Sequence, residues 1–334
     1  MRITRADVVA QLLADASDCP VESSEVYAPA NIALCKYWGK RCSELNLPVT
    51  GSLSLSLGSY GSHLRMSRLA DAATDRVTHN GVALSSETAF VRMLSAYLDL
   101  FRAGLYFNIE TRNTIPTAAG FASSASGFAA TVRGLDTLMG WGLSPQALSI
   151  LARLGSGSAC RSVYDGLVEW NVGTSADGMD SFATPLPDQW PDLRIGLLVL
   201  TDKAKPVGSR QAMQHTVDTS PLYRAWPETV ASDLATIKAA ITERSFACLG
   251  QAVEGNAMAM HATMFAARPG VIYWSPETVA TIARVRQLRD DGLNVYCTMD
   301  AGPNVKLLFL HASQDALEAA FPDVIITNAY SDDA

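Results

Sequence analysis

The sequence predicts a mixed α+β protein in two lobes. Alternating apolar positions, typical of strands, and helical spacings both occur in each half of the chain. The 334 residues exceed the usual size of one domain, and a Gly-, Asp- and Pro-rich stretch at 173–191 lies near the middle. We therefore expect an N-terminal extension of helical character at 1–25, an N-terminal lobe at 26–190 and a C-terminal lobe at 191–334.

The first half contains both periodicities and well-marked turns. Ser52 to Leu57 alternates strictly, as a half-buried strand does, and Asn80-Gly81 is typical of a tight hairpin turn. Ser144-Pro145 has the form of a helix start, with serine as the cap. The predicted elements are a helix at 5–15, strands at 26–28, 52–57, 106–111 and 167–171, and helices at 88–102, from about 123 to 139 and at 144–153.

The second half continues the mixture without internal repeats or low-complexity segments. Hydrophobic residues make up 48% of the chain and charged residues 18%, which suits a folded protein with a large core. The predicted elements are a strand at 195–201, helices at 227–246, 249–264 and 276–290, and strands near 294–299 and 305–310.

Charge and composition exclude several classes of function. The net charge of −7, without a long basic run, argues against nucleic acid or an anionic membrane as the main partner. The N-terminus carries charges where a secretory signal needs an apolar run, and the apolar stretch 195–200 is too short to span a bilayer. Six cysteines without CxxC spacing and five histidines without HExxH pairing indicate reduced thiols in a cytoplasmic protein and no transition-metal site.

The stretch 116–125 is the most informative motif. Small residues, including Gly120, lead directly into a predicted helix, and Ser123 and Ser124 stand where that helix begins. A helix N-terminus presents unpaired N–H donors and partial positive charge, which favours a phosphate. The alternative is an ordinary helix start capped by serine. The stretch is not a Walker motif, because no Gly-Lys-Ser/Thr follows.

Three further stretches group polar side chains. Residues 155–161 combine two serines with Arg161, whose guanidinium can bind a carboxylate or phosphate through two hydrogen bonds. Residues 36–41 hold three cations and two aromatic rings, and Asp300 begins a short turn between two apolar strands. Taken singly, these are equally well a surface Gly-Ser loop, a solvated charged turn and a tight turn.

Together, four stretches resemble the diphosphomevalonate decarboxylases, a branch of the superfamily that includes galactokinase, homoserine kinase and mevalonate kinase. They are 28–40, 115–125, 155–162 and 299–304, and the resemblance runs in order from Ala28 to Leu310. The strings Lys-Tyr-Trp-Gly-Lys and Gly-Ser-Gly-Ser-Ala-Cys-Arg resemble the decarboxylases rather than the kinases.

This resemblance implies the fold and the reaction. The fold would be the two-lobed small-metabolite-kinase fold, with a ribosomal S5 domain 2-like N-terminal lobe and a ferredoxin-like C-terminal lobe. The reaction would be ATP-dependent decarboxylation of mevalonate 5-diphosphate to isopentenyl diphosphate, ADP, phosphate and CO2, through 3-phosphorylation. The resemblance also implies a homodimer, and Mg²⁺ that is carried by ATP rather than held by an assigned metal site.

The resemblance also implies roles for individual residues. Asp300 would be the base or positioning group at the 3-hydroxyl, Arg161 would hold the substrate carboxylate, and Lys36 would support the reacting phosphoryl group. The distal diphosphate would be bound by Tyr37, Lys40, Ser156, Ser158, Ser209 and Arg210. The ATP phosphates would lie on Pro116, Ala118, Ala119, Gly120, Ala122, Ser123 and Ser124.

Some positions depart from the family pattern. Thr50-Gly51-Ser52 replaces the usual Asn-Ser-Ser, Cys42 replaces an acidic residue, and Arg92 is out of register with an arginine that some members carry. These positions concern the phosphate end of the substrate. The alternatives are therefore a phosphomevalonate decarboxylase giving isopentenyl phosphate, a mevalonate-type 3-kinase, a low-specificity ATPase and an inactive metabolite-binding homologue. Arg210 is alternatively a plain loop arginine.

Overall fold

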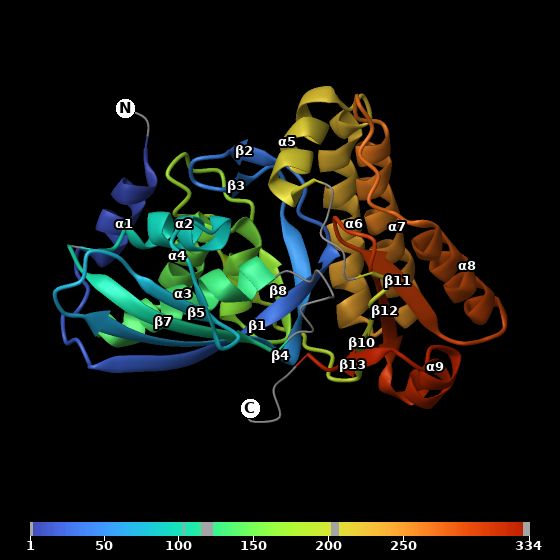
Figure 1. The fold of residues 1–334 in the computed structure, drawn as a ribbon. Coiled ribbons are helices and arrows are strands. Elements are labelled where there is room, and N and C mark those ends of the chain that lie inside the picture. The colour runs from blue at the N-terminus through green and yellow to red at the C-terminus, as the bar shows by residue number, and fades with distance from the viewer. Residues whose placement is uncertain (1–2, 103, 115–122, 202–206, 330–334) are drawn as a thin grey trace.

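The computed structural model describes residues 3–102, 104–114, 123–201 and 207–329. Two sheets with their helices form the two lobes, which lie side by side in Figure 1. The mixed α+β class expected from the sequence is confirmed. In the described part of the chain, no helix is long and apolar enough to cross a membrane.

The N-terminal lobe is built on a seven-stranded sheet in which β4 is the central strand. This long strand pairs antiparallel with β1, β7 and β8 over different parts of its length. Helices α3 and α4 lie on one face of the sheet (Figure 1). Its elements are α1 (Arg5–Leu13), β1 (Ser23–Cys35), β2 (Lys40–Cys42), β3 (Leu47–Pro48), β4 (Ser52–Leu69), β5 (Arg76–His79), β6 (Val82–Leu84), α2 (Ala89–Leu98), β7 (Tyr106–Asn113), α3 (Ser123–Met139), α4 (Pro145–Gly155), η2 (Gly157–Val163), β8 (Leu167–Trp170) and β9 (Ala183–Pro185).

The C-terminal lobe has a four-stranded antiparallel sheet in the order β11-β12-β10-β13. With its strands counted along the chain, this is the order 2-3-1-4 of a ferredoxin-like sheet, which confirms the expectation for this lobe. Helix α7 packs on the sheet and against α6. The elements are β10 (Leu193–Leu198), α5 (Ser209–Thr219), η3 (Tyr223–Ala225), α6 (Trp226–Thr242), α7 (Phe246–Phe265), α8 (Pro276–Asp290), β11 (Val295–Met299), β12 (Val305–Leu310), η4 (His311–Ser313), α9 (Gln314–Ala320) and β13 (Ile325–Thr327).

Local signals behave as the sequence predicts. Ser144 caps α4 by accepting a hydrogen bond from the backbone N–H of Ala147, and Pro145 begins the helix. Asn80 and Gly81 both have positive φ, 49° and 80°, and join β5 to β6. A two-residue hairpin turn of the type I′ class requires this backbone conformation, which asparagine and glycine tolerate.

Several elements differ from the prediction. Helix α5 was expected as a loop, because only Ala212, Met213 and Thr216 are buried and its apolar face is too narrow to be recognised in the sequence. Strands β9, β13 and helix α9 were also not expected. Strand β4 runs twelve residues beyond Leu57, through Gly58 and Gly61, which interrupt the alternating pattern.

The lobes are joined by one shared core and by hydrogen bonds across it. The largest hydrophobic cluster contains β1 and β4 residues together with residues of β10, α6 and α7. The hydroxyl of Thr327 donates to the Leu57 carbonyl at 2.9 Å, and the N–H of Gly166 donates to Ala329 at 3.2 Å. Strand β1 therefore ends directly against the C-terminal lobe, and the residues after it face that lobe.

Candidate active site

A pocket of about 320 Å³ collects residues from both lobes. It is bordered by the end of β1, the start of η2, the start of α5 and the turn that follows β11. Ten of the residues predicted for catalysis or binding line it, and its full lining is Asn31, Ala33, Lys36, Tyr37, Trp38, Lys40, Ser124, Ser156, Gly157, Ser158, Arg161, Ser209, Arg210, Met213, Met260, Asp300 and Ala301.

Asp300 lies between two lysine ammonium groups. Nζ of Lys36 is 2.8 Å from its Oδ1, and Nζ of Lys306 is 3.2 Å from its Oδ2. The lysine side chains are 2% and 4% exposed, whereas Asp300 is 32% exposed. We call these three residues the lysine–aspartate–lysine cluster. The carboxylate is the member of the cluster that faces the pocket.

The two ammonium groups control the ionisation of the carboxyl group. Burial alone raises the pKa of Asp300, but the charges of Lys306 and Lys36 and their hydrogen bonds lower it well below its usual range. Asp300 is therefore a carboxylate at every pH at which the protein is folded and active. Such a group accepts hydrogen bonds well but is a weak proton acceptor in catalysis.

Lys36 is fixed by contacts from both lobes. Its backbone N–H donates to Oδ1 of Asn256 on α7 at 2.7 Å, and its ammonium donates to the Ala33 carbonyl at 2.8 Å. Burial lowers the pKa of Lys36, while Asp300 raises it in partial compensation. The solvated charged turn that the sequence left open for 36–41 is thus wrong for Lys36, because its side chain is 2% exposed.

Arg161 lies at the floor of the pocket on the short 3-10 helix η2. Asn31 accepts hydrogen bonds from its Nε at 3.3 Å and its Nη2 at 3.1 Å, and Ser52 accepts one from its Nη1 at 2.6 Å. Burial lowers the pKa of Arg161. The alternative of a surface Gly-Ser loop is wrong, because most of η2 is buried. Ser52, the serine of Thr50-Gly51-Ser52 next to β8, orients the guanidinium.

The outer part of the pocket carries two more cations. Lys40 donates to Oδ1 of Asn46 at 2.6 Å, and burial and the nearby Arg210 and Arg5 lower its pKa to about 8. Arg210 donates to the Gly155 carbonyl at 2.7 Å from an exposed position. It is not a loop arginine: it lies in the first turn of α5, next to Ser209.

Tyr37 forms the wall between Lys40 and the serines of η2. Its ring packs edge-on against Trp170, with ring centroids 4.8 Å apart. A side chain at Gly157 would come within 2.9 Å of the Tyr37 hydroxyl, so this close approach requires glycine. Ser156 and Ser158, which flank Gly157, also line the pocket. Among the described residues, the Tyr37 hydroxyl has no hydrogen-bond partner.

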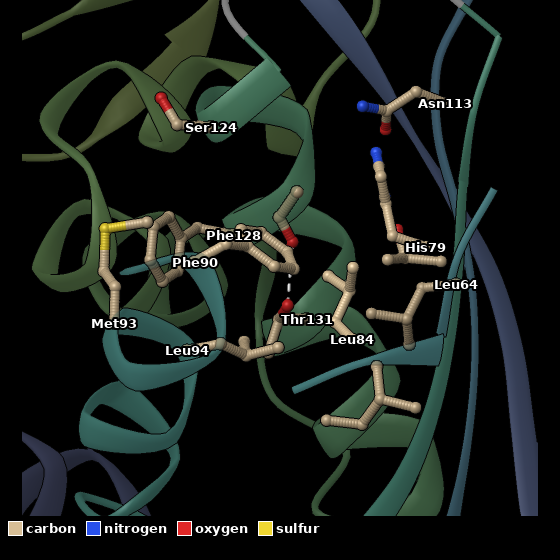
Figure 2. A pocket seen from close by; sticks show the side chains of 13 residues that line it. Leu64, His79, Leu84, Phe90, Met93, Leu94, Asn113, Ser124, Phe128 and Thr131 are labelled. Carbon is tan, nitrogen blue, oxygen red and sulfur yellow. Dashed lines mark hydrogen bonds between the residues drawn. The ribbon is translucent and has the colours of Figure 1, made fainter. Parts of the chain in front are cut away.

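A second pocket of about 360 Å³ lies in the N-terminal lobe between α2, α3 and the sheet (Figure 2). Its walls are mainly apolar, with Phe90, Met93 and Leu94 from α2 facing Leu64 and Leu84 from the sheet. Ser124, at the start of α3, lines both this pocket and the first one. The two pockets therefore meet at the helix start that the sequence predicts as a phosphate site.

Most of the predicted ATP-phosphate loop lies outside the described residues. Pro116, Ala118, Ala119, Gly120 and Ala122 fall in this part, and their expected role stays a prediction. Ser123 is the first residue of α3.

The sequence analysis missed the residues that hold the site together. Lys306 is the most important of them, and a lone lysine within the apolar strand Val305–Leu310 was the available signal. Asn31 and Asn256 had no signal of their own, because nothing in their spacing relates them to Arg161 or Lys36. No three His, Cys, Asp or Glu side chains converge to hold a metal ion in the described ranges.

Comparison with known proteins gives a consistent result. The model of the diphosphomevalonate decarboxylase-like N-terminal domain matches residues 28–183, and that of the mevalonate 5-diphosphate decarboxylase C-terminal domain matches residues 195–332. The diphosphomevalonate decarboxylase of Saccharomyces cerevisiae is 35% identical, over 90% of this chain and 81% of the yeast protein. That of Bos taurus is 35% identical, over 88% of this chain and 78% of its own length.

Solved structures agree with this. Mevalonate diphosphate decarboxylase from Staphylococcus aureus has a TM-score of 0.88 at 35% identity, covering 93% of this chain and 96% of its own. A structure of the protein called MDDEF in complex with MVAPP, AMPPCP and magnesium has a TM-score of 0.87 at 37% identity, covering 93% and 97%. The chain belongs to the diphosphomevalonate decarboxylase family.

Proposed function

We propose that this chain uses ATP to convert mevalonate 5-diphosphate to isopentenyl diphosphate, ADP, phosphate and CO2, with Asp300, Lys36 and Arg161 as its central groups. The observation that carries the proposal is one pocket that holds an ionised carboxylate between two ammonium groups, beside a buried guanidinium. The substrate offers a hydroxyl, a carboxylate and a diphosphate, and the pocket has a matching group for each.

In the first step, Asp300 accepts a hydrogen bond from the 3-hydroxyl and aligns its oxygen with the terminal phosphoryl group of ATP. The low pKa of the carboxyl group favours this positioning role over that of a general base. Lys36 lies against the reacting phosphoryl group and stabilises its charge. Phosphoryl transfer depends on alignment and charge neutralisation, which fixed groups of this kind provide.

In the second step, the 3-phosphate leaves, the bond to the carboxylate breaks and CO2 is released as the double bond forms. Arg161, held by Asn31 and Ser52, fixes the carboxylate. The positive character that develops at C3 is stabilised by the nearby charge of Asp300. The same carboxylate therefore serves both steps without changing its protonation state.

ATP is placed by the two connected pockets. The apolar pocket between α2 and the sheet suits a flat purine base, and Ser124 leads from it toward the phosphoryl-transfer site. Mg²⁺ bound to the ATP phosphates neutralises their charge and aligns them for transfer. The relative MDDEF binds an ATP analogue together with MVAPP and magnesium, which supports this assignment of nucleotide, substrate and ion.

The outer cations select the diphosphate end of the substrate. Lys40, Arg210 and the hydroxyls of Tyr37, Ser156, Ser158 and Ser209 border the part of the pocket farthest along the chain of contacts from Arg161. Two cations suit a diphosphate better than a monophosphate. The names of the relatives support the same choice over phosphomevalonate decarboxylase or a 3-kinase.

Three broader expectations are part of the proposal. The lobes correspond to 26–190 and 191–334, after an N-terminal extension at 1–25. The protein acts in the cytoplasm, which reduced, scattered cysteines support. It forms a homodimer, as the family resemblance implies.

The substrate is tested by incubating the protein with ATP, Mg²⁺ and either mevalonate 5-diphosphate, mevalonate 5-phosphate or mevalonate. We expect ADP and CO2 in equal amounts from the diphosphate, because only this substrate engages both outer cations. ADP and CO2 are measured together over time. Preference for the monophosphate would instead assign the alternative decarboxylase activity, and ADP without CO2 would assign a 3-kinase. No turnover of any of the three would reject the proposal.

The nucleotide pocket is tested with Gly127→Leu. Gly127 lines the pocket on α3, and a side chain there meets no atom within 4 Å, so leucine fills the pocket without disturbing the fold. The KM for ATP should rise at least about tenfold, while the helix gains about 1 kcal/mol in propensity. Gly255→Leu, at an equally open position of α7, is the control and should change neither quantity. An unchanged KM for ATP in Gly127→Leu would place the base elsewhere.

Lys40 gives the substrate affinity a pH dependence. In the free protein its pKa is about 8, below the ordinary 10.5, so the ammonium form predominates below pH 8 and is lost above it. A bound diphosphate favours that form, and binding then requires proton uptake. The KM for mevalonate 5-diphosphate should therefore rise up to about tenfold per pH unit above pH 8.

Lys40→Arg is the matched control for this prediction, because arginine stays charged across the range. Its KM should be flat between pH 7 and 9.5. If wild type and Lys40→Arg share the same profile, Lys40 is not the titrating group.

A further inference from the structure

Lys306 is a buried cation that the proposed reaction does not yet use. It lies within β12, paired opposite Leu197 of β10 and Thr298 of β11, and its side chain is 4% exposed. Its ammonium contacts Oδ2 of Asp300 at 3.2 Å and donates to the Asn304 carbonyl at 3.2 Å. Unlike Lys36, it does not line the pocket.

A lysine at this position is costly for the fold alone. Transferring an ammonium from water to the interior costs several kcal/mol unless a partner of opposite charge compensates. The other inward-facing residues of β12, such as Val305 and Leu308, are apolar, and an apolar side chain would pack there without this cost. The feature that distinguishes this position is the nearby carboxylate of Asp300.

The charged groups around Asp300 come from four elements. Lys36 at the end of β1 holds Oδ1, Lys306 on β12 contacts Oδ2, and Arg161 on η2 lies across the pocket. His261 on α7 faces the backbone carbonyl of Asp300, with its Nε2 at 3.1 Å. Burial and the nearby Lys36 lower the pKa of His261 to about 3, so this ring is neutral.

We propose that Lys306 is a positioning residue for the reaction: by binding Oδ2 while Lys36 binds Oδ1, it fixes the plane and the ionised state of the Asp300 carboxylate that receives the 3-hydroxyl. This inference rests on the proposed function. A carboxylate held on one oxygen can rotate about its last bond, whereas one held on both oxygens presents a single orientation to the substrate. The alignment required for phosphoryl transfer depends on that orientation.

The test compares Lys306→Met, which keeps the length and removes the charge, with Lys306→Arg, which keeps the charge. The control is Lys238→Met, which removes the lysine of the Lys238–Glu169 ion pair outside the site. Turnover of mevalonate 5-diphosphate is measured together with the KM for it and the melting temperature. We expect kcat of Lys306→Met to fall about 10- to 100-fold with its KM within about threefold, and Lys306→Arg to recover most of the loss.

A second measurement does not depend on turnover. The side-chain carboxyl ¹³C resonance of Asp300, assigned by comparison with Asp300→Asn, is followed by NMR as the pH is lowered. In wild type and Lys238→Met it should stay at the ionised position until the protein unfolds, and in Lys306→Met it should titrate at higher pH. A wild-type enzyme without turnover would reject the proposed function, and the NMR titration would still decide the role of Lys306.

Two results would overturn the inference. The first is a Lys306→Met protein with kcat within about twofold of wild type and an unchanged Asp300 titration. The second is a loss of melting temperature and activity together in both Lys306→Met and Lys306→Arg, without a shift of the Asp300 resonance. That pattern would make Lys306 a structural residue only.

Discussion

The carboxylate of Asp300 binds two buried ammonium groups, and this interaction constrains how the lobes are arranged. Lys36 ends a strand of the N-terminal lobe, whereas Asp300 and Lys306 flank a turn of the C-terminal sheet. Charges removed from water are stable only when their partners lie at contact distance. The two lobes must therefore meet at this point, and the shared core and the Asn256 contact to Lys36 hold them there.

The same arrangement explains how an acidic protein binds a polyanionic substrate. The net charge of the chain is −7, yet Lys36, Lys40, Arg161 and Arg210 all border one pocket. Their mutual repulsion is visible in Lys40, whose pKa burial and Arg210 lower to about 8. An empty pocket of this kind is electrostatically unfavourable, and a bound diphosphate and carboxylate relieve the repulsion. Binding energy is thereby directed to the charged ends of the substrate, which orients the 3-hydroxyl toward Asp300.

Much of this could be predicted from the sequence, because strongly local signals carry it. The alternation in Ser52 to Leu57 and the Ser144-Pro145 helix start depend only on neighbouring residues, and the motifs around Lys36, Arg161 and Asp300 resemble a known family. What could not be predicted depends on contacts between distant segments. Helix α5 has a narrow apolar face, and Lys306 appears in the sequence as an isolated charge in a strand. Its meaning arises only when β12 is placed beside the turn of Asp300.

The measurement that tests this account most directly is the turnover of Asp300→Asn with mevalonate 5-diphosphate and ATP, with ADP and CO2 followed together. Asparagine keeps the shape of the side chain but removes the charge that pairs with both lysines. The account predicts a loss in kcat of at least about a thousandfold, with the melting temperature near that of wild type. Near-normal turnover with ADP and CO2 still in equal amounts would contradict it.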